Sequence, residues 1–288
     1  MHRRTFVQAL GAAVASPTAL PAAFGRLGRP EAAARRVERI GIQLYSLRDA
    51  AARDLPATLR DIAAVGYREV ELLDSMRNFG MAAKPLRALL DRVGLRAPST
   101  HIDTKALDDV PRLVGDAQTL GHAYVVVASL PIDRRTVTLD DYRRWADRLN
   151  TAGEAVRSAE LWLAFHDEPE HFARIDGRIA YDVFVERLDP ARVRLQLDTG
   201  NAALGGQDPL RYMQRYADRY WLFHVKDAAR LGAEHDAELG TGVVDLKRIL
   251  AVTPTLDGRY VYVEQESYPA APIDSVRRDY AYLKALTF

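Results

Sequence analysis

Short apolar segments recur along the chain at intervals of roughly thirty residues, the size of one strand–helix unit. Between them lie longer stretches, such as 55–65 and 139–156, whose apolar residues fall at helical spacing. Apolar runs of this length are typical of the buried strands of a parallel sheet. The expected strands are 39–45, 68–73, 95–101, 123–128, 160–166, 192–198, 220–225 and 259–264.

Eight such units in about 250 residues predict a single-domain (β/α)8 barrel, or TIM barrel, over residues 38–288. Gly66, Gly94 and Gly121 each precede an expected strand, where the last turn of a helix requires a positive φ. The alternative is an open, doubly wound α/β sheet. It is disfavoured by the number of strands and by the lack of a Gly-rich phosphate loop after the first strand.

The first 37 residues do not follow this pattern. Arg3 and Arg4 precede an apolar, Ala-rich segment at 9–20. The arrangement resembles a twin-arginine export signal, and the segment is too short for a stable membrane span. We therefore predict that residues 1–37 are a signal peptide and leader, and that the mature protein is periplasmic without a membrane contact. A leader that only resembles a signal is the alternative.

Charge and cysteine content narrow the possible functions. Forty basic and thirty-nine acidic residues give a net charge of +1, with no long run of either sign. This balance argues against a nucleic-acid partner. The chain has no Cys, so any metal must be held by His, Asp and Glu.

Polar side chains follow the expected strands at their carboxyl ends, which is where barrels of this type carry their chemistry. Asp198, His224 and Glu264 end the last three strands. Ligands of these types suit Mn²⁺, Zn²⁺, Co²⁺ or Mg²⁺, and the strand at 160–166 is the natural source of a fourth. Taken singly, Asp198 can be a helix cap and His224 a core histidine bonded to a carbonyl. Together the three favour a metal site.

Such a site suggests proton transfer next to a carbonyl. A metal that polarises the carbonyl lets a neighbouring Glu remove an acidic C–H proton, which leads to epimerisation, isomerisation or elimination. Lys226 lies on the same face of its strand as His224 and is a candidate donor to a developing oxyanion; a solvated salt bridge with Asp227 is the alternative. Glu71 is a candidate supporting or substrate-binding residue, or else pairs with an Arg at the rim.

Several motifs resemble those of the xylose isomerase-like TIM barrels, also called sugar phosphate isomerase/epimerases. The resemblance covers residues 38–288, and its most specific part is the combination of HVKD at 224–227 with GTGVVD at 240–245. Further support comes from GIQLYSLR at 41–48, GYREVE at 66–71, STH at 99–101 and VE at 263–264. The family implies a divalent metal held by Glu, Asp, His and Glu, of which Asp198, His224 and Glu264 match the last three. Glu264 would also be one of two proton-transfer carboxylates.

The chain departs from the family after the fifth strand. Many relatives have Tyr-His-Asn-His and, two residues later, Glu-Phe, whereas this chain has FHDEPEHF at 165–172. Without a gap, His171 takes the position of the Glu ligand, while Glu168 or Glu170 can serve if the loop shifts. We predict His171 as the fourth metal ligand and Glu168, Glu264 and Lys226 as catalytic residues. The expected substrate-binding residues are Gln43, Glu71, His101, His166 and Arg230.

We predict a divalent-metal-dependent isomerase, epimerase or lyase that acts on an unphosphorylated keto-sugar or 3-keto-glycoside. Export and the lack of a phosphate loop favour the unphosphorylated substrate. The alternative is a non-catalytic, exported sugar-binding barrel, favoured by the change at 165–172. A nuclease is disfavoured by the balanced charge. The expected partner is a small sugar, and family members often form homo-oligomers.

Overall fold

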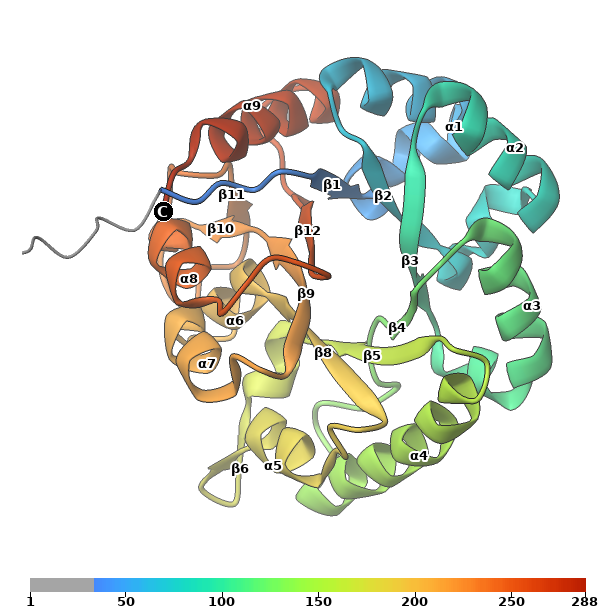
Figure 1. Ribbon diagram of the computed structural model, residues 1–288. Coiled ribbons are helices and arrows are strands. Elements are labelled where there is room, and N and C mark those ends of the chain that lie inside the picture. Colours follow the sequence, from blue (N-terminus) through green and yellow to red (C-terminus); the bar gives the residue numbers. More distant parts are fainter. Residues whose placement is uncertain (1–33) are drawn as a thin grey trace, which may run out of the picture. The chain divides into compact units, whose positions relative to one another are not determined.

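The computed structural model describes residues 34–288, so nearly all of the predicted leader lies outside the described residues. The main strands are β1 (Ile40–Gln43), β2 (Glu69–Leu73), β3 (Arg96–Ile102), β4 (Tyr124–Val127), β5 (Trp162–His166), β8 (Val193–Asp198), β9 (Tyr220–Val225) and β12 (Tyr260–Val263). They form a closed parallel barrel in the order β1-β12-β9-β8-β5-β4-β3-β2 (Figure 1). Each strand coincides with one of the eight expected segments, and the predicted (β/α)8 barrel is confirmed.

Helices surround the barrel (Figure 1). They are α1 (Arg48–Val65), α2 (Ala83–Val93), α3 (Val110–Leu120), α4 (Leu139–Arg157), α5 (Ala180–Arg187), α6 (Thr199–Leu204), α7 (Pro209–Tyr216), α8 (Leu246–Val252) and α9 (Pro272–Ala285). The predicted positive φ at Gly94 and Gly121 is confirmed: these residues end α2 and α3 with φ of 74° and 79°. Within residues 34–288, no helix has the length and apolar character required to cross a membrane.

Shorter elements lie in the loops at the carboxyl ends of the strands. The described part of the chain has four 3-10 helices, η1 (Leu44–Leu47), η2 (Asp74–Gly80), η3 (Thr104–Asp108) and η4 (Pro169–Phe172). Two small antiparallel pairs are β6 (Arg174–Ile175) with β7 (Arg178–Ile179), and β10 (Asp227–Ala228) with β11 (Asp236–Ala237). Because they follow strand ends, these elements build the walls above the barrel.

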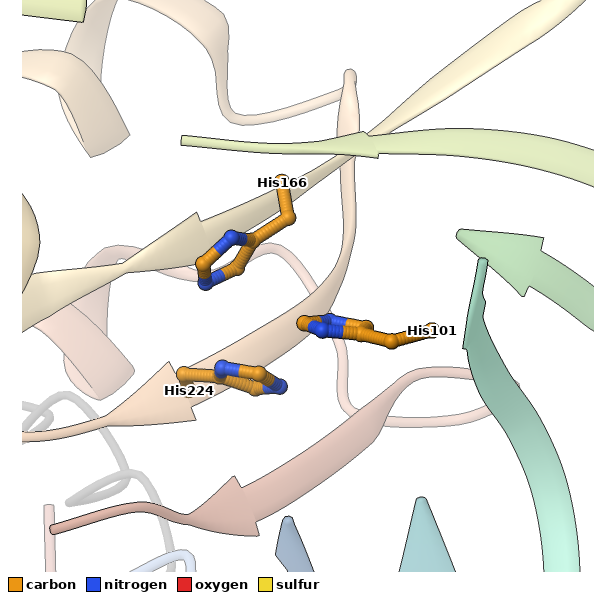
Figure 2. Close-up of side chains that lie close together, drawn as sticks. All are labelled: His101, His166 and His224. Carbon is orange, nitrogen blue, oxygen red and sulfur yellow. The ribbon is translucent and has the colours of Figure 1, made fainter. Parts of the chain in front are cut away.

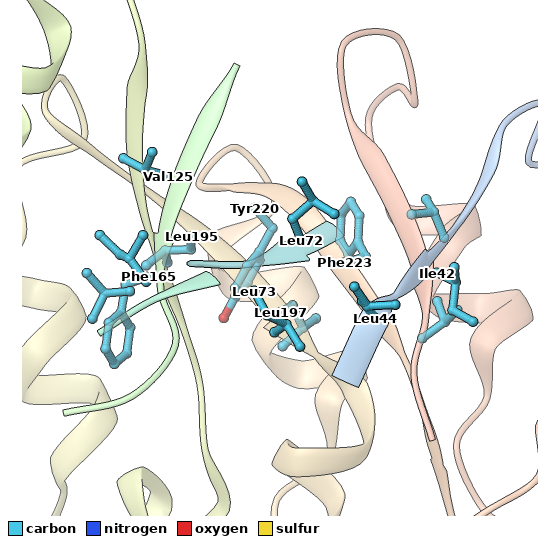
Figure 3. Packing of buried hydrophobic residues seen from close by; sticks show 14 of the residues in the cluster. Ile42, Leu44, Leu72, Leu73, Val125, Phe165, Leu195, Leu197, Tyr220 and Phe223 are labelled. Carbon is cyan, nitrogen blue, oxygen red and sulfur yellow. The ribbon is translucent and has the colours of Figure 1, made fainter. Parts of the chain in front are cut away.

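Side chains alternate between the two faces of each strand. Val125, Phe165, Leu197 and Phe223 face outward and belong to the large core shared with the helices (Figure 3). The residues that alternate with these along the strands point to the opposite face. They form a small separate cluster, namely Tyr124, Val126, Ala164, Leu222 and Tyr262.

The small cluster fills the barrel interior. Ser99 Oγ on β3 donates a hydrogen bond to Tyr262 Oη on β12 at 2.7 Å, although β1 and β2 separate these strands in the barrel wall. This bond must therefore cross the interior. Toward the carboxyl ends of the strands, the inward-facing positions of the same alternation carry polar side chains.

Candidate active site

Inward-facing polar residues meet at the carboxyl ends of the strands. They follow the interior cluster along each strand with a period of two, so that His166 comes two residues after Ala164 and His224 two after Leu222. Above them lies a cavity of about 800 Å³, with walls from the segments 45–48, 73–76, 101–103, 128–134, 166–170, 201–204, 233–236 and 264–267. The most buried residues of this site are Gln43, Glu71, His101, His166, Gln196, Asp198, His224, Lys226 and Glu264, each at most 6% exposed.

Four of these side chains form a cluster with the composition of a metal site. His166, Asp198, His224 and Glu264 each offer one ligand atom, and these atoms lie within 4.8 Å of one another. His166 Nε2 is 3.5 Å from Asp198 Oδ2, and His224 Nδ1 is 2.9 Å from Glu264 Oε2. Figure 2 shows the rings of His166 and His224 close together beside that of His101, each from a different strand. We call these four residues the ligand quartet.

Two atoms of the ligand quartet are buried without a hydrogen-bond partner. They are His166 Nε2 and Asp198 Oδ2. His166 Nδ1 donates to the carbonyl of Ala128 at 2.9 Å, so a neutral ring carries its lone pair on Nε2. Burial lowers the pKa of His166, but the adjacent Asp198 raises it to about 9. The position between these two atoms therefore attracts positive charge. Such unpaired buried atoms are uncommon, and the two-His, two-carboxylate donor set fits a divalent cation.

Asp198 and His224 combine roles that the sequence presented as alternatives. Asp198 Oδ1 accepts a hydrogen bond from the backbone N–H of Asn201 and so caps α6, while Oδ2 faces His166 of the ligand quartet. His224 is fully buried, and its two nitrogens meet the carboxylates of Glu264 and Glu71 rather than a backbone carbonyl.

Glu71 contacts the ligand quartet through His224. Its Oε2 accepts hydrogen bonds from Gln43 at 2.7 Å, from Gln196 at 3.0 Å and from His224 Nε2 at 2.5 Å. Burial raises the pKa of Glu71, but the nearby His101 and His224 rings lower it to about 2. A salt bridge with Arg was an alternative for Glu71; that arrangement belongs instead to Glu69, two residues earlier, which pairs with Arg96.

His101 completes this hydrogen-bond network. The amide nitrogen of Gln196 donates to both oxygens of Glu71, which leaves Gln196 Oε1 to accept from His101 Nε2 at 2.9 Å. Burial lowers the pKa of His101 to about 4, so the ring is neutral at pH 7. His101 also lies on the cavity wall.

Lys226 is fully buried beside the ligand quartet. Its Nζ lies 2.9 Å from Asp198 Oδ2 and 3.0 Å from Glu264 Oε2, and it donates hydrogen bonds to Glu266 and Asn201 at 2.7 and 3.1 Å. Burial lowers the pKa of Lys226, but the three carboxylates raise it well above the usual value. A solvated salt bridge of Lys226 with Asp227 is therefore wrong.

Asp227 holds the loop that contains the GTGVVD motif through hydrogen bonds to its backbone. Its carboxylate accepts backbone N–H groups of the following loop, and this folds the loop back onto the strand end. The donors are Ala228, Gly240, Gly242 and Val244, at 2.8 to 3.0 Å. Asp245 then caps α8 by accepting the N–H of Arg248.

Glu168 faces the cavity with a 30% exposed side chain. Its Oε2 accepts a hydrogen bond from Asn201 Nδ2 at 3.2 Å, and its Oε1 lies 3.8 Å from His166 Nδ1. Burial raises the pKa of Glu168 to about 7. A carboxyl group with this pKa can both accept and return a proton near neutral pH.

The structure places two predicted site residues elsewhere. His171 is not part of the ligand quartet: its Nδ1 accepts the N–H of Glu168, and its ring packs 5.3 Å from that of Phe165. Burial lowers the pKa of His171 to about 3. The exposed Arg230 donates hydrogen bonds to the nearby carbonyls of Leu231 and Gly232. Among residues 34–288, the arginines that line the cavity are Arg48 and Arg134.

Sequence reasoning missed several residues of the site. Gln196 lies two positions before Asp198 and so on the same strand face, a signal that the period-two rule contains. Asn201 follows Asp198 by one helical turn and bonds to Lys226 and Glu168. Asp236 lies in the β10–β11 hairpin and lines the cavity, and no local pattern marks it.

Inosose dehydratases from two bacteria resemble the chain. The inosose dehydratase of Lacticaseibacillus casei is 28% identical over 172 residues, or 53% of this chain and 57% of that protein, so the chain spans little more than half of that relative. The inosose dehydratase of Geobacillus kaustophilus (strain HTA426) is 26% identical over 271 residues, covering 78% of this chain and 83% of that protein.

Solved structures share the fold. A sugar phosphate isomerase/epimerase from Parabacteroides distasonis ATCC 8503 superimposes with a TM-score of 0.71 at 25% identity, over 86% of this chain and 93% of that chain. The IolI protein, whose crystal structure contains a zinc atom, superimposes with a TM-score of 0.64 at 14% identity, over 84% and 95%. The family described as xylose isomerase-like TIM barrel matches residues 35–286, and the chain belongs to that family.

Proposed function

We propose that this protein is a divalent-metal-dependent isomerase, epimerase or lyase that acts on an unphosphorylated keto-sugar or 3-keto-glycoside. The observation that carries the proposal is the ligand quartet beside a cavity of sugar size, in which the buried His166 Nε2 has no hydrogen-bond partner. The relatives support it, because they include inosose dehydratases and a zinc-containing protein of the same fold.

His166, Asp198, His224 and Glu264 would hold the cation, with His166 in the place for which His171 was predicted. A bound divalent cation would polarise the substrate carbonyl and so acidify the neighbouring C–H bond. Glu71 accepts the hydrogen bond of His224 Nε2, so Nδ1, which faces Glu264 and Asp198, would be the nitrogen that binds the cation once its proton is released.

Glu168 is the residue best placed to move the substrate proton. It reaches the cavity, its pKa is raised to about 7, and Asn201 orients one of its oxygens. Glu264 is the second candidate because it belongs to the ligand quartet and also lines the cavity. The predicted role of Lys226 as a donor to a developing oxyanion stays a prediction.

The charge of the cavity favours a neutral substrate. Its lining carboxylates outnumber its two arginines, Arg48 and Arg134, and the acidic residues include Glu168, Glu170, Glu234, Asp236 and Glu266. Arg134 is moreover paired with Glu170 at 3.0 Å. A phosphate group would meet net repulsion here. A periplasmic location, which rests on Arg3, Arg4 and the apolar segment after them, agrees with an unphosphorylated sugar.

The decisive experiment is elemental analysis of the protein purified without chelator, beside His224→Ala. We expect about one divalent cation per chain in the wild type and its loss in the variant. Proton exchange of keto-sugars in D₂O would then test turnover, with Glu264→Gln as the inactive reference. Sugar binding that is indifferent to chelators, in a protein that takes up no metal, would favour the non-catalytic sugar-binding barrel.

A further inference from the structure

We propose that the ammonium group of Lys226 is a built-in counter-cation of the metal centre. It would keep the two carboxylates of the ligand quartet in place when no metal is bound, and it would weaken the hold on the metal when one is. This inference rests on the proposed metal site and assigns to Lys226 a role in setting the metal affinity.

The first argument is that Lys226 contacts the same atoms as the metal would. Its Nζ lies 2.9 Å from Asp198 Oδ2 and 3.0 Å from Glu264 Oε2. Asp198 Oδ2 nevertheless has no partner with hydrogen-bond geometry, so this contact is mainly electrostatic. The oxygen remains able to bind a second cation on the side of His166, 3.5 Å away.

The second argument is that the backbone and the aliphatic part of the Lys226 side chain are held in place. Thr199 Oγ1 accepts the N–H of Lys226 at 3.0 Å and donates to its carbonyl at 2.7 Å, which anchors the backbone. Gly200 packs directly on the stem, and a Cβ at that position would collide with Cγ of Lys226. The ammonium group can therefore move only by rotation about its last bonds.

The third argument is that Lys226 has partners outside the ligand quartet. Nζ donates to Glu266 Oε1 at 2.7 Å and to Asn201 Oδ1 at 3.1 Å. The amide nitrogen of Asn201 bonds to the carbonyl of Asp167 at 2.9 Å, and this keeps its oxygen directed toward Lys226. Neither bond involves Asp198 or Glu264, so the ammonium group would keep both if those two carboxylates held a metal.

Two opposite effects follow from these contacts. Without a metal, Asp198 and Glu264 are buried carboxylates that need a positive neighbour, and loss of Lys226 leaves them less compensated. A bound metal would be held by the same two carboxylates, and its charge and that of the ammonium group would repel each other. Removal of the Lys226 charge should therefore destabilise the metal-free protein and tighten metal binding.

The test compares wild type and Lys226→Met by titration of the chelator-treated proteins with Zn²⁺ and by thermal unfolding with and without Zn²⁺. We expect the variant to bind Zn²⁺ tighter by about tenfold or more, because a positive charge next to the site is gone. We also expect its metal-free form to melt below the metal-free wild type, with Zn²⁺ closing most of that gap. Unchanged or weaker binding by a folded variant would overturn the inference.

A second variant covers the case in which Lys226→Met does not fold. Glu266→Gln changes a side chain that is 39% exposed and outside the ligand quartet. The ammonium group then depends more on Asp198 and Glu264, so Zn²⁺ binding should weaken several-fold. Tighter or unchanged binding in Glu266→Gln would argue against the counter-cation. If the wild type itself takes up no Zn²⁺, Mn²⁺ or Co²⁺, the metal site fails, and this inference fails with it.

Discussion

His224 donates a 2.5 Å hydrogen bond from Nε2 to Glu71 Oε2, while its other ring nitrogen faces Glu264 at 2.9 Å. Glu71 is fully buried, and its pKa of about 2 keeps it ionised. Its carboxylate therefore acts only as a hydrogen-bond acceptor toward His224. Burial lowers the pKa of His224, but the carboxylates of Glu264 and Glu71 raise it well above its usual value, so the metal-free ring carries a proton on each nitrogen. Glu71 would keep the Nε2 proton if Nδ1 gave up its own to bind a metal. A carboxylate that holds a histidine in this way is a frequent support for metal ligands.

Substitution of Glu71 by Gln should lower metal affinity without dismantling the barrel. The amide loses the charge that holds the His224 proton, and losses of about 10- to 100-fold are typical of such supporting residues. Isothermal titration with Zn²⁺ measures the change. Glu69→Gln is the matched control, because Glu69 lies on the same strand but pairs with Arg96 away from the ligand quartet. Equal affinity in the two variants would contradict this role of Glu71.

His166 and His171 offer a direct test of which histidine completes the metal site. His166→Ala should abolish stoichiometric metal binding, because it removes one member of the ligand quartet. His171→Ala should retain the metal, but it should lower the free energy of unfolding by about 2 kcal/mol, because it leaves a cavity and an unbonded N–H on Glu168. Metal analysis and denaturant unfolding of both variants are the measurements. The reverse pattern would restore His171 as the ligand.

Asp227 should contribute to stability through its four backbone hydrogen bonds. In Asp227→Asn, one carboxylate oxygen becomes an NH₂ group that faces N–H donors, at a cost of about 2–3 kcal/mol. Urea unfolding measures this loss. Asp245→Asn, in the same loop, is the control: Asn caps helices about as well as Asp, so its stability should stay close to that of the wild type.

Asp279 on α9 should make stability depend on pH. The side chain is 1% exposed, and its burial raises the pKa to about 7 from an ordinary value near 4. The folded state then holds the proton more tightly than the unfolded state, so this residue reduces stability as the pH rises from about 4 to about 7. Above pH 7 the full penalty applies.

Asp279→Asn should therefore raise the free energy of unfolding at pH 8 by about 1–2 kcal/mol, and by less at pH 5. The Asn oxygen can still accept the N–H of Leu239, as Asp279 Oδ1 does at 2.9 Å. Denaturant unfolding at the two pH values gives the comparison. Asp274→Asn, an exposed change on the same helix, controls for the loss of a carboxylate from α9. An equal gain at both pH values would argue against a titrating Asp279.

The sequence by itself determined the barrel and most of the chemistry at its rim. Outward-facing residues such as Val125 and Phe223 must be apolar because helices cover them, and this requirement marks all eight strands. In a closed parallel barrel the carboxyl ends of all strands meet at one end, whichever strands carry the polar residues. Asp198, His224 and Glu264 could therefore be grouped without knowledge of any distance.

Only the tertiary structure placed His166, and not His171, in the ligand quartet and defined the surroundings of Lys226. The turn at Pro169–Phe172 directs the His171 ring into the core beside Phe165. The spacing of residues in the sequence does not specify that direction. Lys226 is buried because Thr199 and Gly200, from the preceding unit, close over its stem. Both outcomes depend on contacts between different secondary-structure elements, and the pattern of any one element cannot specify such contacts.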